Sequence, residues 1–237
     1  MTDSIFFKNN NNFLIFGIQH ILVVSFFLVL GFILIRSAKN VSEEKQFKIG
    51  NIIGFTLSAT ILVGTALKIY FFGFDIKKDL PFQLCYFIAL FFPVFTISRK
   101  KVYYDILLFW ILAGTFQAIF SPELKNGFPH LHFIKFWIIH CGLIIAIFYA
   151  TFVYNMRPTL KSSFISFFAL QGYFVLTLFI NKITGANYFY LNAKPNVPSV
   201  LDYLGDWPNY IIVVELFLIP YFLLIYAPFY LTSKKIV

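Results

Sequence analysis

The segment Asp79-Leu80-Pro81-Phe82-Gln83-Leu84-Cys85 stands at the start of a long apolar run. Proline fits the first turn of a helix, where its missing N–H would have no partner, so Pro81 predicts a helix start. Asp79 then fits the N-cap, where its negative charge suits the positive helix end. Gln83 and Cys85 follow about one turn deep, at roughly 1.5 Å per residue. An amide and a thiol among Phe, Leu and Ile mark this segment as a candidate site.

The composition outside this segment is that of a membrane protein. Hydrophobic residues make up 59% of the 237 residues and charged residues only 12%, which is too few for an ordinary soluble domain. Several apolar runs of about 18 residues or more indicate transmembrane helices. The net charge of +9 would suggest nucleic acid in a soluble protein. Here the basic residues lie between apolar runs, so membrane topology explains them and no nucleic-acid partner is expected.

The apolar runs predict an all-α fold, a polytopic bundle of seven transmembrane helices that forms a single domain over residues 1–237. The first run is preceded by a leader with only Lys8 as a basic residue. That run is also too long for a signal-peptide core, so no cleavage is expected. The predicted spans are residues 13–35, 52–72, 82–97, 102–120, 133–153, 164–183 and 210–231.

Basic residues divide unevenly between the two sets of connections. The outer side, which holds the connections 73–81, 121–132 and 184–209, keeps the other eight basic residues of the chain together with acids such as Asp79, Glu123 and Asp202. The positive-inside rule therefore predicts the N-terminus outside and the C-terminus inside. The inside set holds eleven of the 19 basic residues: Arg36, Lys39, Lys45, Lys48, Arg99, Lys100, Lys101, Arg157, Lys161, Lys234 and Lys235.

Five polar side chains fall at similar depth in the predicted spans, roughly 5–13 Å below the outer boundary. They are His20, Cys85, Gln117, His140 and Glu215. Polar groups in a membrane are costly, so each is a candidate for function. Each also has a structural alternative, such as a satisfied buried histidine, interhelical hydrogen bonding or a small apolar filler.

A thiol and an imidazole in one layer predict nucleophilic chemistry. A free thiol is only a few per cent thiolate at neutral pH, and an adjacent imidazole can take its proton. Because Cys85 is placed beyond the first turn, where the helix dipole fades, His140 is expected to do most of the activation. Cys141 is a weaker candidate, since it lies about 100° around the helix from His140.

Supporting roles follow from helix geometry. Gln83 is two residues from Cys85 and so does not share its helix face well. Gln117 is therefore the preferred donor to a developing oxyanion, with Gln83 second. His20 or Glu215 would orient His140 in the manner of a third triad member.

A metal site is not expected. His130 and His132 precede the fifth span, and with His140 and Glu215 they offer possible ligands. Their spacing matches no strong zinc signature. No metal and no other cofactor is predicted.

The connection 184–209 is long for so compact a protein, and long loops are often lids or binding loops. Its polar and aromatic residues, together with His130, are predicted to contact substrate. The alternative is a loop that covers the site without a role in the reaction, ordered by its prolines and anchored at the membrane–water interface by Tyr and Trp. The residues in question are Asn187, Tyr188, Tyr190, Lys194 and Trp207.

Several short motifs together resemble those of the YwaF-type bacterial integral membrane proteins, a family that includes the eukaryotic transmembrane protein 164. The resemblance covers roughly residues 13 to 231. The motifs are Leu80–Cys85, Trp110 with Ala113–Ala118, Ser121-Pro122, Gly127–His130, His140, Asn187-Tyr188, Lys194-Pro195, Pro198-Ser199, Leu201-Asp202 and Trp207-Pro208.

The resemblance implies a multi-span helical protein. For the eukaryotic relatives it implies acyl transfer onto ether phospholipids through a cysteine and a histidine, which carry over to Cys85 and His140. Gln83 stands where many bacterial members have histidine, which leaves the retained activity and substrate open.

The sequence thus predicts a lipid acyltransferase, or a thiol-dependent lipid hydrolase, that acts on phospholipid acyl esters near the outer leaflet. Its expected partners are a membrane phospholipid or lysophospholipid and the bilayer itself. The alternative is a transporter or ligand-sensing seven-helix protein, in which the polar layer would be a substrate site.

Overall fold

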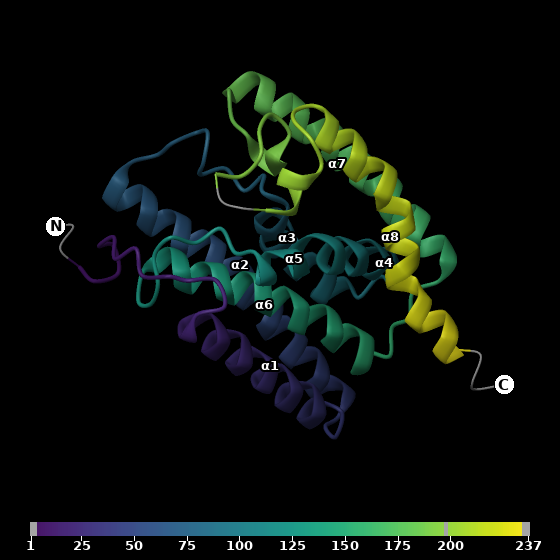
Figure 1. Ribbon diagram of the computed structural model, residues 1–237. Helices are drawn as coiled ribbons and strands as arrows, with labels where there is room; N and C mark the ends of the chain where they lie inside the picture. The colour runs from purple at the N-terminus through teal and green to yellow at the C-terminus, as the bar shows by residue number, and fades with distance from the viewer. Residues whose placement is uncertain (1–3, 197–198, 234–237) are drawn as a thin grey trace.

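The computed structural model describes residues 4–196 and 199–233, and the regular elements within them are all helical (Figure 1). Two short 3-10 helices, η2 (Tyr188–Tyr190) and η3 (Val200–Tyr203), lie in the last connection. The predicted all-α bundle of seven transmembrane helices is confirmed. The spans are α1 (Ile18–Ala38), α2 (Glu43–Phe72), α3 (Leu84–Ser98), a continuous helix of α4 (Lys101–Trp110), η1 (Ile111–Thr115) and α5 (Phe116–Phe120), α6 (Leu131–Phe152), α7 (Leu160–Thr184) and α8 (Asn209–Ser233).

Each predicted span coincides with one of these helices, although the ends differ. Six helices within the described residues are long and apolar enough to cross a membrane alone. The seventh, α3, has 15 residues and is roughly 22 Å long, which is shorter than the roughly 30 Å hydrocarbon core. Three predicted positions, Pro198, Lys234 and Lys235, lie outside the described residues.

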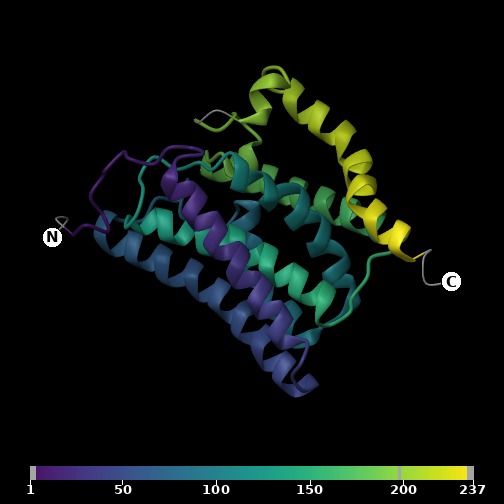
Figure 2. The same ribbon diagram turned by 60° about the horizontal axis from the view of Figure 1, so that its bottom comes forward.

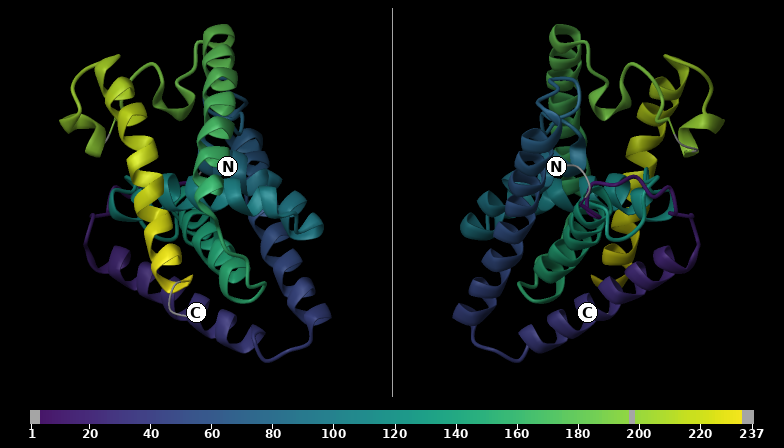
Figure 3. Two further views of the ribbon diagram at one scale, coloured as in Figure 1. Left: turned by 90° about the vertical axis from the view of Figure 1, so that its right-hand side faces the viewer. Right: turned by 90° about the vertical axis from the view of Figure 1, so that its left-hand side faces the viewer.

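Helix α6 is the centre of the bundle. In its most apolar window 56% of the residues are buried, against 11% in α1 and in α8. α2 and α1 pack on α6, whereas α8 packs mainly on α7 at the other edge. Figure 2 shows α1 crossing in front of α2 and α6, and Figure 3 shows α7 and α1 at opposite edges of the bundle.

The start of α3 differs from the prediction. The helix begins at Leu84, and Gln83 occupies the N-cap with extended angles (φ −71°, ψ 132°). The prediction that Asp79 caps this helix and Pro81 forms its first turn is wrong. Contacts with neighbours hold the chain extended there, because the Tyr173 hydroxyl on α7 donates to the carbonyl of Phe82 at 2.7 Å.

The start of α3 also lies deep relative to α2. Lys135 on α6 places its ammonium 4.6 Å from the ring centre of Tyr86, the third residue of α3. The Lys135 stem also passes Gly64, where an added Cβ would come within 2.8 Å of it. Gly64 precedes the end of α2 at Phe72 by eight residues, which is roughly 12 Å. The first turn of α3 therefore lies at the level of Gly64, about two turns before the end of α2.

The fourth span contains a π-helical segment, η1, between α4 and α5. A π turn inserts one extra residue and rotates everything that follows relative to a regular helix. Thr115, the last residue of η1, is completely buried, whereas Gln117 is exposed. Such segments are frequent at functional sites.

Three connections, 73–83, 121–130 and 185–208, meet the N-terminal segment at one end of the bundle, which we call the loop end. The Asn-rich leader is held there, since the side-chain oxygens of Asn10 and Asn12 both accept from the N–H of Gly127. Glycine leaves room for these side chains, because a Cβ at this position would lie 2.2 Å from the Gln19 side-chain oxygen and 2.4 Å from that of Asn12.

Candidate functional site

Cys85 is the second residue of α3, so it lies within the first turn and not beyond it as the sequence predicted. Unpaired N–H groups and the helix dipole at this end favour a negatively charged thiolate. The Cys85 side chain is half-buried. Its Sγ lies 3.5 Å from the Thr115 hydroxyl, at the end of the π-helical segment.

Gln83 has a defined structural task at the start of α3. Its side-chain oxygen accepts from the backbone N–H of Phe189 at 3.1 Å. Phe189 and Tyr190 have positive φ angles of 59° and 54°, an unusual conformation for large side chains that needs support from its surroundings. Gln83 therefore fixes the 185–208 connection above Cys85. A histidine ring nitrogen at position 83 can accept the same hydrogen bond.

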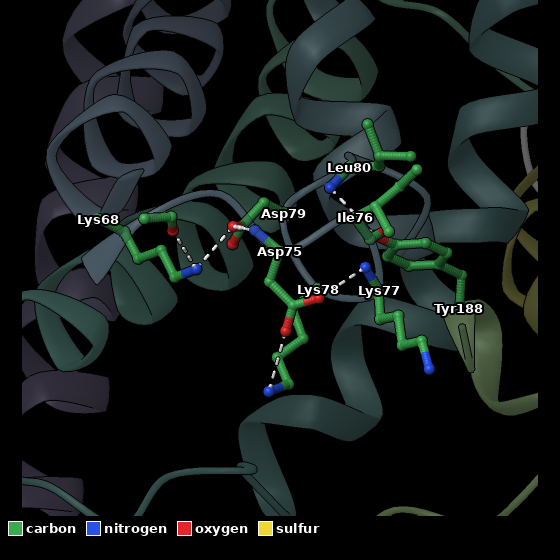
Figure 4. A network of polar contacts seen from close by, with 9 residues as sticks. Lys68, Asp75, Ile76, Lys77, Lys78, Asp79, Leu80 and Tyr188 are labelled. Carbon is green, nitrogen blue, oxygen red and sulfur yellow. Dashed lines mark hydrogen bonds and ion pairs between the residues drawn. The ribbon is translucent and has the colours of Figure 1, made fainter. Parts of the chain in front are cut away.

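The 73–83 connection is held by a network of polar contacts (Figure 4). Lys68 on α2 pairs with Asp79 at 2.6 Å and also donates to the carbonyl of Gly73. The Asp79 carboxylate also accepts from the backbone N–H of Asp75, at 2.7 Å. The side chain of Asp79 is only 7% exposed, so this ion pair is a buried anchor and not a helix cap.

Tyr188 joins this connection to the 185–208 connection. Its hydroxyl donates to the carbonyl of Ile76 and accepts from the N–H of Leu80, as Figure 4 shows. The side chain of Asn181, in the last turn of α7, binds both the N–H and the carbonyl of Tyr188. Through these hydrogen bonds of its hydroxyl and backbone, Tyr188 holds the two connections together. Its predicted substrate contact stays a prediction.

A carboxylate and two tyrosines surround the thiol on the loop side. The Tyr190 hydroxyl donates a hydrogen bond to the Glu123 carboxylate. Cys85, Tyr86 and Glu123 are all close enough to interact electrostatically with Tyr190. Burial and then the Glu123 carboxylate raise the pKa of Tyr190, so its hydroxyl stays protonated and remains a donor.

His140 lies in α6 with one ring nitrogen engaged. Its Nδ1 is 2.8 Å from the carbonyl of Phe136, and its ring stacks on the Phe136 ring at 3.9 Å. Because a carbonyl only accepts, Nδ1 carries the proton, and Nε2 of the neutral ring keeps a free lone pair. No hydrogen bond among the described residues joins His140 to Cys85, so their pairing stays a prediction.

The residues expected to orient His140 are bound elsewhere. His20 accepts from the N–H of Phe16 through Nδ1 and donates to the carbonyl of Ile119 through Nε2, which uses both ring nitrogens. Glu215 accepts from the side chain of Gln171 at 2.8 Å. The backbone carbonyl of Phe136 is the hydrogen-bond partner of His140 among the described residues. The predicted role of His20 or Glu215 as third member stays a prediction.

The remaining predicted site residues mostly shape the loops. His130 caps α6 by accepting from the N–H of His132, and Asn187 binds backbone groups of Asn192 and Ala193. Lys194 lies 3.5 Å from Asp206, and the Trp207 indole donates to the carbonyl of Leu191. No cluster of three metal-ligating side chains occurs in the part of the chain described.

An apolar cavity of about 260 Å³ lies between α3 and α4. Phe91 and Val94 on its rim are 52% and 48% exposed on the outside of the bundle, so the cavity opens sideways toward lipid. Tyr173 packs on two of its lining rings, Phe87 and Trp110. The lining residues are Phe87, Ile88, Phe91, Val94, Phe95, Tyr103, Ile106, Leu107 and Trp110.

Sequence reasoning missed Thr115, Glu123 and Lys135. Thr115 was hidden because the π-helical segment turns it toward Cys85, and a regular helical template does not anticipate this. Glu123 lies in a loop, where no periodic pattern in the sequence indicates which residues it contacts. Lys135 did carry a signal, because it is a charged residue inside a predicted span.

The comparisons with known proteins agree with the motifs. The model of the TMEM164 family matches residues 15–226. A protein of Treponema pallidum (strain Nichols), described as uncharacterized, is 25% identical over 190 residues, which cover 77% of this chain and 76% of that protein. No solved structure matches the chain.

Proposed function

The chain belongs to the TMEM164 family, and from this premise we propose that it transfers acyl chains between phospholipids with Cys85 as the nucleophile. The observation that carries the proposal is the position of the thiol. It lies in the first turn of a recessed helix, 3.5 Å from a buried threonine hydroxyl, on the helix that also lines a lipid-facing apolar cavity.

Two features support formation of the thiolate. The N-terminal turn of α3 favours a negative charge on Cys85. His140 presents an unprotonated Nε2 in the tautomer that its bond to Phe136 selects, which is the form that a general base needs. In our proposal this nitrogen takes the thiol proton directly or through a water.

The proposed reaction has two balanced steps. The Cys85 thiolate attacks the ester carbonyl of a phospholipid, the carbon–oxygen ester bond breaks, and the departing lysolipid oxygen takes the proton from His140. In the second step His140 removes the proton of a lysophospholipid hydroxyl, whose oxygen attacks the thioester and releases Cys85.

The surroundings of the thiol support the transfer. The predicted oxyanion donor Gln117 is exposed, whereas the Thr115 hydroxyl already contacts Sγ. Thr115 is therefore our proposed donor to the developing oxyanion. The cavity between α3 and α4 would hold the acyl chain, since it is apolar and opens to the bilayer side.

Acyl movement in a defined bilayer tests the proposal. The purified chain is reconstituted with a phospholipid that carries a labelled acyl chain and an unlabelled lysophospholipid. Mass spectrometry is expected to find the label on the acceptor, in equal amount to the lysolipid released. Labelled free fatty acid alone would identify a hydrolase. If neither product forms, the proposal fails and the transport alternative becomes the better one.

We also propose that the loop end faces the cell exterior across a bacterial cytoplasmic membrane, because the basic connections lie at the other end. Lys194→Cys and Lys100→Cys, each with Cys85→Ala and Cys141→Ala, test this in intact cells. A membrane-impermeant maleimide is expected to label position 194 at once and position 100 only after lysis. The reverse pattern would contradict the proposed orientation.

A further inference from the structure

Lys135 is a cation inside the membrane-spanning part of α6 that forms no ion pair with a carboxylate of the described residues. Its ammonium lies 4.6 Å from the centre of the Tyr86 ring. The ion pairs among the described residues do not include it. A charge in a span is costly and usually marks a binding or transport function.

Two other lysines at the loop end are neutralised by ion pairs. Lys68 is paired with Asp79 at 2.6 Å, and Lys78 is paired with Asp75 at 3.1 Å. Asp79 interacts with Lys135 at longer range, but Lys68 opposes that interaction. Asp79 is already paired with Lys68, and no ion pair among the described residues neutralises the positive charge of Lys135 beside α3.

The fold makes room for this side chain beside the first turn of α3. The absence of a side chain at Gly64 lets the Lys135 stem pass α2, since a Cβ there would lie 2.8 Å from Lys135 Cδ. The ammonium then reaches Tyr86, the residue that follows Cys85 in the first turn of α3. On its own helix Lys135 interacts electrostatically with His132. The positive charge thus stands where α2, α3 and α6 meet, at the level of the thiol.

We propose that Lys135 binds the phosphate group of the phospholipid whose ester is presented to Cys85. This inference rests on the proposed function and names the part of the substrate that the site recognises. A phosphate supplies the negative charge that no described carboxylate provides, and an ammonium makes strong charge-assisted hydrogen bonds to its oxygens. In a phospholipid the phosphate and the ester lie on the same glycerol unit, so one charge beside the first turn of α3 would position both.

Lipid binding without turnover tests this assignment. The full-length chain with Cys85→Ala is titrated in detergent with a phosphatidylglycerol and with the diacylglycerol of identical chains, and bound lipid is counted by native mass spectrometry. Adding Lys135→Met to this variant is expected to weaken phosphatidylglycerol binding by about tenfold, because one charge-assisted contact is lost. Adding Lys135→Arg instead should leave the affinity for phosphatidylglycerol unchanged. Diacylglycerol should bind equally to all three.

The matched control is Lys182→Met, an exposed lysine in the last turn of α7 at the same end, which should leave binding unchanged. Equal binding by the Lys135→Met protein, or equal losses for both lipids, would overturn the proposal. Displacement of the phospholipid by millimolar inorganic phosphate would show a free-phosphate site and overturn the lipid assignment. Lys135→Gln replaces the Met variant if that variant does not fold. Transfer by the Cys85-containing protein is measured separately, so failure of binding and failure of catalysis are distinguishable.

Discussion

Cys85→Ala is expected to lower acyl transfer by at least about a thousandfold, because removal of a covalent nucleophile leaves only binding and electrostatic effects. The variant should fold normally, since Cys85 is half-buried and its Sγ has one contact with a hydroxyl in the described part of the chain, at 3.5 Å. Transfer of the labelled acyl chain in reconstituted bilayers measures the loss.

Cys141→Ala is the matched control. This thiol is buried among Phe133, Phe136 and Trp137, in a cluster separate from the one that Cys85 contacts, and transfer should survive its removal. His140→Ala should lower the rate of acyl transfer by roughly 100-fold to 10,000-fold, which is the usual contribution of a general base. Full transfer by Cys85→Ala would exclude the covalent route.

Asp79→Ala is expected to destabilise the protein by about 2–3 kcal/mol. Removal of one partner of a fully buried ion pair costs about 3–5 kcal/mol. The cost here is smaller because the side chain of Lys68 is 33% exposed and stays partly hydrated. The backbone N–H of Asp75 also loses its acceptor. The midpoint of unfolding in detergent, by heat or denaturant, measures the change.

Asp75→Ala is the control for this second prediction, because its pair with Lys78 is much more exposed, at 35% and 77% of the side chains. Exposed pairs contribute at most about 1 kcal/mol. Equal destabilisation by both variants would show that the Lys68–Asp79 pair is not the anchor of the 73–83 connection.

Much of the fold was predictable because each span is a long apolar segment with polar ends, and these patterns depend on local composition. The start of α3 was not predictable in this way. Asp79 and Pro81 form a good local helix start, but Lys68 on α2 and Tyr173 on α7 bind this segment in an extended form. Tertiary contacts therefore override the local signal.

The candidate site was predictable in part. Cys85 could be found because a thiol follows a helix start, but its true depth required the boundary at Leu84. Thr115 required knowledge of the π-helical segment, which rotates it toward the thiol in place of Gln117. Tyr190 and Glu123 meet across 67 residues, and no periodicity in the sequence brings such loop residues together.

The central claim is that Cys85 carries the acyl chain as a thioester, and the mass of the intact protein tests it most directly. The protein is incubated with phospholipid alone and then quenched in acid. The account predicts an increase equal to one acyl group, removed by neutral hydroxylamine and located on the peptide that contains Cys85. An adduct on Cys141, or acyl transfer that proceeds with no adduct on Cys85 at any time point, would contradict it.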